Sequence, residues 1–173
     1  MKKQIFLIGY RATGKSTVGK VLSNLINWKF VDLDNEIEMY SGRTIKDIFD
    51  REGEKVFREI ESEVLRKVSK LEKVVISTGG GVIIKKENRD MLKEGFVILL
   101  ESSIDTIVSR MIKDDNRPSL TDLPLREEVV KTLSYRKPLY EEVYNVKYLN
   151  ENVDVYVIAS LIKNVLPSGF LEV

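Results

Sequence analysis

The chain has 173 residues, of which 43% are hydrophobic and 32% charged, proportions that fit one globular domain and exclude the disordered and fibrous classes. Its 28 Lys and Arg residues almost balance its 27 Asp and Glu residues, so no excess of positive charge indicates a nucleic-acid or membrane partner. The chain lacks Cys and His, which excludes disulfides, thiolate or imidazole metal sites and histidine-based catalysis, and leaves carboxylates, Lys, Arg and backbone amides to carry any chemistry.

Five short apolar runs, rich in β-branched residues, predict strands over residues 4–8, 29–33, 73–78, 96–101 and 145–149. Helical spacing between them predicts helices over residues 15–26, 54–71, 104–113, 125–143 and 153–165. This alternation predicts an α/β fold with a parallel sheet, because the crossover between parallel strands is usually a helix. Several of the runs are apolar almost throughout, which predicts a sheet buried on both faces. No repeat or linker divides the chain, so we expect one domain over residues 1–173.

The first residues are basic and then apolar, as in a signal peptide. The apolar run is too short for one, however, and no small-residue cleavage site follows it. No stretch approaches the roughly 18 apolar residues of a membrane span. We therefore expect a cytoplasmic protein without a membrane or nucleic-acid partner.

The loop between the first predicted strand and helix reads GYRATGKS, from Gly9 to Ser16, and fits the pattern G-x-x-x-x-G-K-[ST] of phosphate-binding loops (P-loops). Glycines let successive amides point at phosphate oxygens, and the next helix presents the positive end of its dipole to the same anion. Lys15 supplies a charge for the β- and γ-phosphates, and Ser16 offers a hydroxyl to Mg²⁺. The alternative is a glycine-rich turn with a solvated lysine, but the position between a strand and a helix favours phosphate binding. We expect nucleotide contacts at seven positions of this segment: Gly9, Ala12, Thr13, Gly14, Lys15, Ser16 and Thr17.

Two carboxylates, Asp32 and Asp34, stand at the end of the second predicted strand. Residues two apart on a strand share a face, so both side chains are predicted to point the same way at the strand's carboxyl end, where ligands bind in open α/β sheets. In the functional interpretation, Asp32 orients a water on Mg²⁺ and Asp34 accepts the proton of an attacking hydroxyl. The alternative is that Asp34 caps the next helix.

Two later segments also break the regular pattern. The third strand runs into Gly79, Gly80 and Gly81, and three consecutive glycines favour a close approach to the backbone over a plain loop. The segment 113–124, KDDNRPSLTDLP, is too long and polar for a tight connection, so it is either a surface loop or a mobile lid at about 112–124.

Together with FREIE at 57–61, NRPSL at 116–120 and YRKPLYEE at 135–142, these motifs closely resemble shikimate kinases in order and spacing, over essentially the whole chain. The resemblance implies a nucleoside-monophosphate-kinase-like fold with a five-stranded parallel sheet in the order 2-3-1-4-5. It also implies Mg²⁺-dependent transfer of the ATP γ-phosphate to the 3-hydroxyl of shikimate, on the route to chorismate, by a protein that we expect to be a monomer acting on small molecules.

Carried over by position, the resemblance makes Asp34, Arg58, Arg136 and the backbone of residues 79–81 the shikimate site. It places Arg117 on the lid, reaching toward the transferring phosphate, and Arg110 beside the adenine. The chemistry agrees, because an arginine fork matches the carboxylate of shikimate, and Glu61 follows Arg58 at a helical spacing that allows it to brace the guanidinium.

The sequence departs from the family pattern at three places. Arg11 replaces a smaller residue and is either a surface charge or an extra contact. Ser119 stands where an apolar residue is usual, and the segment 150–157, NENVDVYV, matches the adenine-side pattern poorly, so we assign no adenine contact there.

The nearest alternative functions are kinases of other small metabolites, such as gluconate, and nucleoside monophosphate kinases. A nucleoside monophosphate acceptor requires a base pocket, whereas the DLD and FREIE motifs fit a carboxylated polyol better. A GTPase-like switch is the alternative from another class. Its D-x-x-G motif is imitated by DREG at 50–53, but this lies between two helical segments and no N-K-x-D motif occurs.

Overall fold

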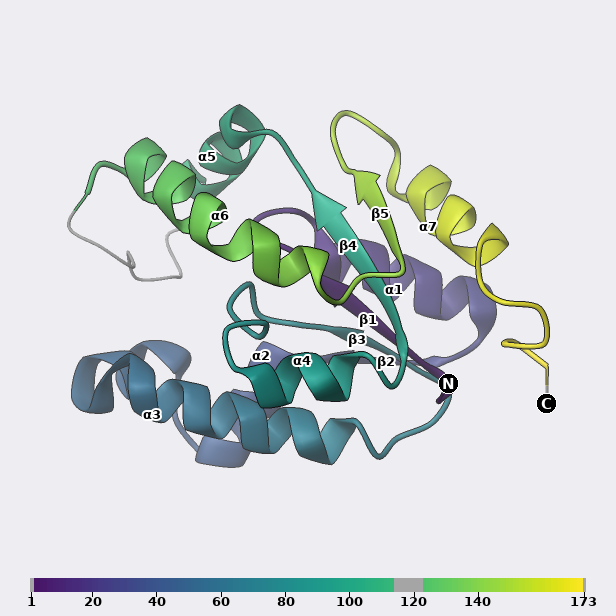
Figure 1. Ribbon diagram of the computed structural model, residues 1–173, viewed down its shortest axis with the longest axis horizontal. Coiled ribbons are helices and arrows are strands. Elements are labelled where there is room, and N and C mark those ends of the chain that lie inside the picture. Colours follow the sequence, from purple (N-terminus) through teal and green to yellow (C-terminus); the bar gives the residue numbers. More distant parts are fainter. Residues whose placement is uncertain (1, 114–122, 173) are drawn as a thin grey trace.

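A computed structural model describes residues 2–113 and 123–172 of the chain (Figure 1). Its centre is a five-stranded parallel sheet in the order β2-β3-β1-β4-β5. The strands are β1 (Gln4–Ile8), β2 (Lys29–Asp32), β3 (Val74–Ser77), β4 (Phe96–Glu101) and β5 (Val146–Leu149). Because β1 lies between β3 and β4, the chain turns from one half of the sheet to the other at the end of β1, where ligands bind in such folds.

Helices cover both faces of the sheet and extend past its carboxyl edge (Figure 1). They are α1 (Lys15–Ile26), α2 (Leu33–Ser41), α3 (Ile45–Val68), α4 (Lys86–Leu92), α5 (Ile104–Ile112), α6 (Leu125–Glu141) and α7 (Val155–Asn164). The helices α1 and α7 pack on one face, whereas α2, α3, α4 and the end of α6 pack on the other.

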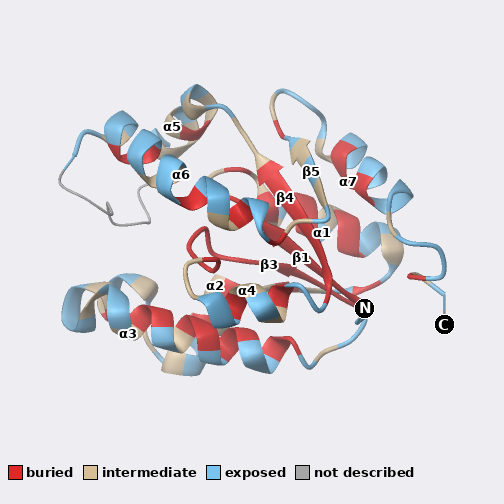
Figure 2. Cartoon of the chain, in the orientation of Figure 1, coloured by how far each residue is buried: buried red, intermediate tan, exposed pale blue. Residues whose placement is uncertain are grey.

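Alternate residues of the central strand enter the two cores, as the period of two in a strand requires. Phe6 and Ile8 pack with α3 and α4, and Ile5 and Leu7 pack with α1 and α7. A third, smaller cluster around Tyr10 joins the start of the first loop to α5 and α6. Figure 2 shows the result: the central strands β1, β3 and β4 are almost entirely buried, the edge strands β2 and β5 are partly exposed, and the outer sides of the helices are exposed.

The predicted α/β class and strand order are confirmed, and the predicted strands match the observed ones to within about a residue at each end. No bounds were predicted for α2, α4 or the first part of α3, although the sequence analysis considered a helix after Asp34 and placed a helical segment before DREG. Gly53 interrupts α3 with a φ of 80°, so the helix predicted from residue 54 is the second of two segments, and DREG does lie between them. The first segment has Ile45, Ile48 and Phe49 at the helical spacing i, i+3, i+4, but it is barely two turns long.

In the part of the chain that the structure covers, no helix combines the length and the apolar character that crossing a bilayer requires.

Candidate active site

The loop after β1 adopts the backbone conformations that a phosphate-binding loop needs. Gly9, Ala12 and Gly14 all have positive φ values, of 138°, 62° and 87°. Gly14 is the N-cap of α1 and no side chain caps this helix, so its first amides remain available to an anion at the positive end of the helix dipole. A side chain at Gly9 would overlap the Leu100 carbonyl of the neighbouring strand, which explains glycine at this tight turn.

Lys15 is folded back onto its own loop. Its Nζ donates to the Tyr10 carbonyl at 2.7 Å, and the Thr13 hydroxyl donates to the same oxygen at 2.8 Å. Both side chains are buried, Lys15 at 7% exposure. The ammonium group is therefore held within the ring of the loop, next to the amides that start α1.

The two aspartates do not share a strand face, and that prediction is wrong. The strand β2 ends at Asp32, which is the N-cap of α2 and accepts a hydrogen bond from the Asp34 amide at 3.1 Å. Asp34 therefore lies in the first turn of α2, because a capping side chain at Asp32 starts the helix two residues earlier than the strand pattern predicts. The helix-capping role that the sequence analysis considered for Asp34 is therefore played by Asp32.

Asp32 has a second contact that joins it to the phosphate-binding loop. Its Oδ2 accepts a hydrogen bond from the Ser16 hydroxyl at 2.6 Å, and the Ser77 hydroxyl lies 3.1 Å from the same Ser16 oxygen. A hydroxyl, a carboxylate and a second hydroxyl thus meet at the start of α1, all of them hard oxygen donors of the kind that Mg²⁺ prefers.

Two residues from distant elements support the outer side of the loop. Arg110, on α5, donates to the Ala12 carbonyl at 3.0 Å and to the Asn150 carbonyl at 3.3 Å. Asn150 follows β5, is buried, and donates to the Thr13 carbonyl at 2.9 Å. Arg110 thus contacts the loop itself, and Asn150 is a supporting residue that the sequence reading missed, although its place after a strand's carboxyl end was a usable signal.

The three glycines after β3 lie against the charged side chains and against the phosphate-binding loop. A β-carbon at Gly79 would be 3.0 Å from Glu61 Oε1 and 3.2 Å from Asp34 Oδ1, and one at Gly80 would be 3.1 Å from the Arg11 amide. At Gly81 it would overlap the Arg58 guanidinium, whose Cζ lies 2.5 Å away. The predicted close approach to the backbone is present, made by the protein's own side chains and loop.

Arg58 lies among carboxylates at the centre of the second group of predicted residues. Its Nη1 donates to Glu61 Oε2 at 2.7 Å, and its Nε and Nη2 donate to Glu54 Oε1 at 3.1 and 3.0 Å. Desolvation by itself lowers the pKa of Arg58, but Glu61 and Glu54 outweigh it and raise that pKa, so the group stays charged. Burial raises the pKa of the fully enclosed Glu61, although Arg58 opposes the shift.

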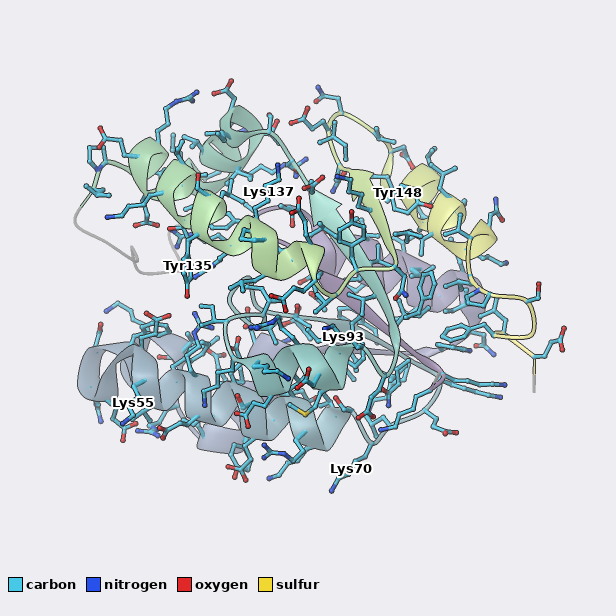
Figure 3. The ribbon with its side chains drawn as sticks, viewed as in Figure 1. Lys55, Lys70, Lys93, Tyr135, Lys137 and Tyr148 are labelled. Atoms are coloured by element: carbon cyan, nitrogen blue, oxygen red, sulfur yellow. The ribbon has the colours of Figure 1, made fainter. Side chains whose placement is uncertain are left out.

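Arg136 reaches the same region from α6. It is buried at 5% exposure, with its Cζ 5.7 Å from the centre of the Tyr10 ring, whereas its sequence neighbours Tyr135 and Lys137 are exposed and leave the helix on other sides (Figure 3). Arg136 Nε and Glu61 Oε1 are both buried without a hydrogen-bond partner among the residues described. Unsatisfied buried polar atoms are rare, and here they fit a pocket prepared for a polar ligand.

Tyr140, one turn further along α6, joins these parts. Its hydroxyl donates to the Gly80 carbonyl at 2.5 Å and also interacts with Arg136. Burial raises the pKa of this hydroxyl, and Arg136 offsets the shift only in part. Tyr140 therefore links the glycine loop to the arginine, a role that the sequence reading did not identify.

Two cavities open beside these residues. The larger, of about 580 Å³, is lined by the loop residues 11, 12 and 14–17, by Asp34 and by apolar residues of α5 and the start of α6. The smaller, of about 60 Å³, is lined mainly by Phe49, Phe57, Arg58, Glu61, the three glycines and Arg136. The structure thus brings five of the predicted nucleotide residues, Ala12 and Gly14 to Thr17, and the predicted acceptor residues to two adjoining spaces, with Asp34 in the wall of both. Gly9, Thr13 and Arg110 line neither cavity.

The roles predicted for the lid segment and its residues stay predictions. Arg117 and Ser119, with most of the segment predicted to be a lid, lie outside the described residues. The rings of Phe49 and Phe57 pack together with centroids 4.7 Å apart beside the core, and both residues also line the smaller cavity.

Comparisons with known proteins agree with this geometry. The family model described as "Shikimate kinase" matches residues 11–166. The chain is 38% identical to the shikimate kinase of Pasteurella multocida, covering 95% of each chain, and 41% identical to that of Buchnera aphidicola subsp. Schizaphis graminum, covering 95% of this chain and 96% of the relative. Among solved structures, shikimate kinase from Acinetobacter baumannii in complex with shikimate superposes with a TM-score of 0.88 at 34% identity, covering 95% of both chains.

Proposed function

This chain belongs to the shikimate kinase family, and we propose that it transfers the γ-phosphoryl group of ATP to the 3-hydroxyl of shikimate. The reaction is a step of aromatic amino-acid biosynthesis on the route to chorismate. The observation that carries the proposal is the adjacency of the two cavities, one beside a phosphate-binding loop and one lined by buried arginines, with the Asp34 carboxylate common to both. A kinase needs its two substrates to meet at such a point.

The loop and the start of α1 hold the triphosphate. Backbone amides at the uncapped start of α1 donate to phosphate oxygens, and Lys15 exchanges its Tyr10 contact for the β- and γ-phosphates. Arg110 and Asn150 keep the loop in shape from behind, and we propose that Arg110 also lies near the adenine.

Ser16 and Asp32 would hold Mg²⁺, Ser16 directly and Asp32 through a water. Their contact supplies a hydroxyl and a carboxylate at the phosphate-binding loop, and a set of few protein oxygens fits this metal, which keeps several waters and binds substrate phosphates. Consistently, the described residues contain no cluster of three or more acidic side chains that would form a protein cage. When bound, the metal neutralises charge on the β- and γ-phosphates.

The smaller cavity receives the acceptor. Arg58 and Arg136 donate to the carboxylate of shikimate, and the backbone of residues 79–81 and Asp34 contact its hydroxyls. A volume of about 60 Å³ holds roughly two waters, so the side chains that line this cavity have to rearrange as the acceptor enters.

Asp34 is the general base. As the acceptor oxygen attacks the γ-phosphorus and the bond to ADP breaks, the Asp34 carboxylate takes the proton of the hydroxyl. We further propose that Arg117 reaches the transferring phosphate from a lid at about 112–124, and that residues 1–173 form one monomeric, cytoplasmic domain without a nucleic-acid or membrane partner.

A coupled ADP-release assay tests the function. It offers shikimate, gluconate and nucleoside monophosphates side by side, each with ATP and Mg²⁺, and with a no-acceptor control. We expect ADP release to depend on shikimate, and the product to be phosphorylated at the 3-hydroxyl. Equal ADP release with and without shikimate, or a preference for another acceptor, would refute the proposal.

A further inference from the structure

One arginine stands at the boundary between the two cavities. Of the described residues that line them, Arg11 and Asp34 are the two that appear in both walls. If ATP binds in one cavity and the acceptor in the other, the phosphoryl group has to move past this boundary. Asp34 has a role there as the base, whereas the proposed function assigns none to Arg11.

The following inference rests on the proposed function. We propose that Arg11 is a catalytic residue that donates hydrogen bonds to the transferring phosphoryl group. Glu128 is the residue that positions Arg11. The sequence reading left Arg11 as either a surface charge or an extra contact. Its side chain is 10% exposed and forms an ion pair with Glu128, so it is not a surface charge.

Glu128 can fix the guanidinium because it is itself fixed. It lies in the first turn of α6, which bounds the larger cavity, and its side chain is fully buried. A buried carboxylate requires a partner, so the pair resists rearrangement more than an exposed one does. The Arg11 side chain thus joins the phosphate-binding loop to α6 and lines both cavities.

Pairing with Glu128 does not exhaust the donors of Arg11. A guanidinium has five N–H groups and a carboxylate accepts from at most two of them in a fork, so a guanidinium that is paired with a carboxylate can still donate to the phosphoryl oxygens of a bound substrate. The Arg11 backbone also packs closely against the glycine loop, since a β-carbon on Gly80 would lie only 3.1 Å from the Arg11 amide nitrogen. The charge is thereby held in advance where negative charge spreads over the equatorial phosphoryl oxygens in the transition state.

The reaction itself is unchanged by this assignment. The bond from phosphorus to the ADP oxygen breaks, the bond to the acceptor oxygen forms, and the proton goes to Asp34. Arg11 stays protonated throughout and exchanges nothing with the substrates, so its whole contribution is electrostatic.

The competing explanation is that the ion pair only attaches the loop to α6. Four full-length variants separate the two explanations: Arg11→Met, Arg11→Lys, Glu128→Gln and the double variant Arg11→Met/Glu128→Gln. For each, kcat, the two KM values and the thermal midpoint are measured. Arg89→Met is the matched control, because Arg89 is 12% exposed, is also paired with a glutamate, and lines neither cavity.

We expect Arg11→Met to lower kcat about 100-fold, with both KM values within about threefold of the wild type. Glu128→Gln should lower kcat less, by about tenfold, because the donor remains but is less well placed. Arg11→Lys should recover only part of the activity, since a point charge lacks the fork. The Arg11→Met variant loses a partner of a buried carboxylate and should melt several degrees lower.

The double variant gives the decisive result. Removing the Glu128 charge as well should restore the thermal midpoint but leave kcat as low as in Arg11→Met alone. Recovery of kcat together with the midpoint would show that the pair is only structural and would overturn the proposal. So would an equal loss of kcat in Arg89→Met, which would trace the loss to general destabilisation.

A second measurement checks contact with the phosphoryl oxygens themselves. Sulfur accepts hydrogen bonds less well than oxygen, so the ratio of the rates with ATP and with ATPγS should be smaller in Arg11→Met than in the wild type. An unchanged ratio would contradict the assignment. A wild type without shikimate-dependent activity would instead refute the proposed function, so the two failures are distinguishable.

Discussion

The nucleotide side and the acceptor side of this site are built in different ways. The nucleotide side is one continuous loop and the start of one helix, and it presents mainly backbone amides. The acceptor side gathers charged side chains from α2, α3 and α6 around a glycine loop, and those from α3 and α6 are buried. All nucleotides carry phosphate groups, and backbone amides can bind these groups. Recognition of one particular carboxylated alcohol needs side chains that several elements of the fold place around it.

Asp34 belongs to both sides, and its replacement should have the largest effect. In Asp34→Asn, the amide cannot accept the hydroxyl proton, so we expect kcat to fall about 10²- to 10⁴-fold. ATP affinity, measured by fluorescence titration or calorimetry, should stay nearly unchanged because the phosphate contacts come from the loop. Loss of ATP affinity would place Asp34 with the nucleotide side alone.

Arg58→Ala should damage the acceptor side selectively. Loss of a charge-assisted hydrogen bond should raise the KM for shikimate about 10- to 100-fold, while the ATP affinity remains nearly intact. Gly81→Ala should act in the same direction, because the new β-carbon overlaps the Arg58 guanidinium.

Arg43→Ala is the control for this pair, since it removes an arginine from a partly exposed ion pair with Glu52 that lines neither of the two cavities. A collapse of ATP affinity in Arg58→Ala would show that the two sides are not separable.

Asn150→Ala should damage the nucleotide side by a smaller amount. The variant loses the hydrogen bond from the Asn150 amide to the Thr13 carbonyl, which supports the loop from behind. We expect the KM for ATP to rise up to about tenfold and the KM for shikimate to stay within about twofold. Asn164→Ala, an exposed replacement at the end of α7, serves as the control. A change in the shikimate KM alone would reverse the assignment.

Tyr140→Phe should have the smallest effect, a rise of about threefold in the KM for shikimate, because it removes one hydrogen bond to the acceptor-side glycine loop.

The Tyr140 hydroxyl should also make the stability of the protein depend on pH. Burial raises the pKa of Tyr140 in the folded state, so its contribution to stability is present below about pH 10 and is lost as the pH rises through the folded value.

Denaturant unfolding of the wild type and of Tyr140→Phe between pH 8 and about pH 11 tests this, with the exposed Tyr135→Phe as control. The stability difference between the wild type and Tyr140→Phe should shrink above about pH 10. A difference that stays constant would mean that the hydroxyl does not remain buried and protonated.

The difference between the two sides also explains which predictions from sequence succeed. The loop is correctly predicted because its residues are neighbours in the chain, and each residue type has a local reason: positive φ at Gly14, and a helix start at Lys15. The geometry predicted for Asp34 is wrong because a side-chain cap at Asp32 ended the strand early, and capping competes with strand pairing on nearly equal terms. Glu128 and Tyr140 carry no local signal, since each acts on a loop far away in the chain, and the one local signal of Asn150 is its place after a strand's carboxyl end.

By itself, the sequence determined the α/β class, the phosphate-binding loop and, through resemblance, the family and its strand order, because strand and helix periodicity and a contiguous motif are local properties of the chain. Only the tertiary structure decided that Arg58 lies against Gly81, that Arg11 is paired with Glu128, and that two cavities share one boundary. The reason is physical. A buried charge is stable only beside a partner, and partners that come from different elements meet only after the sheet and its helices have packed.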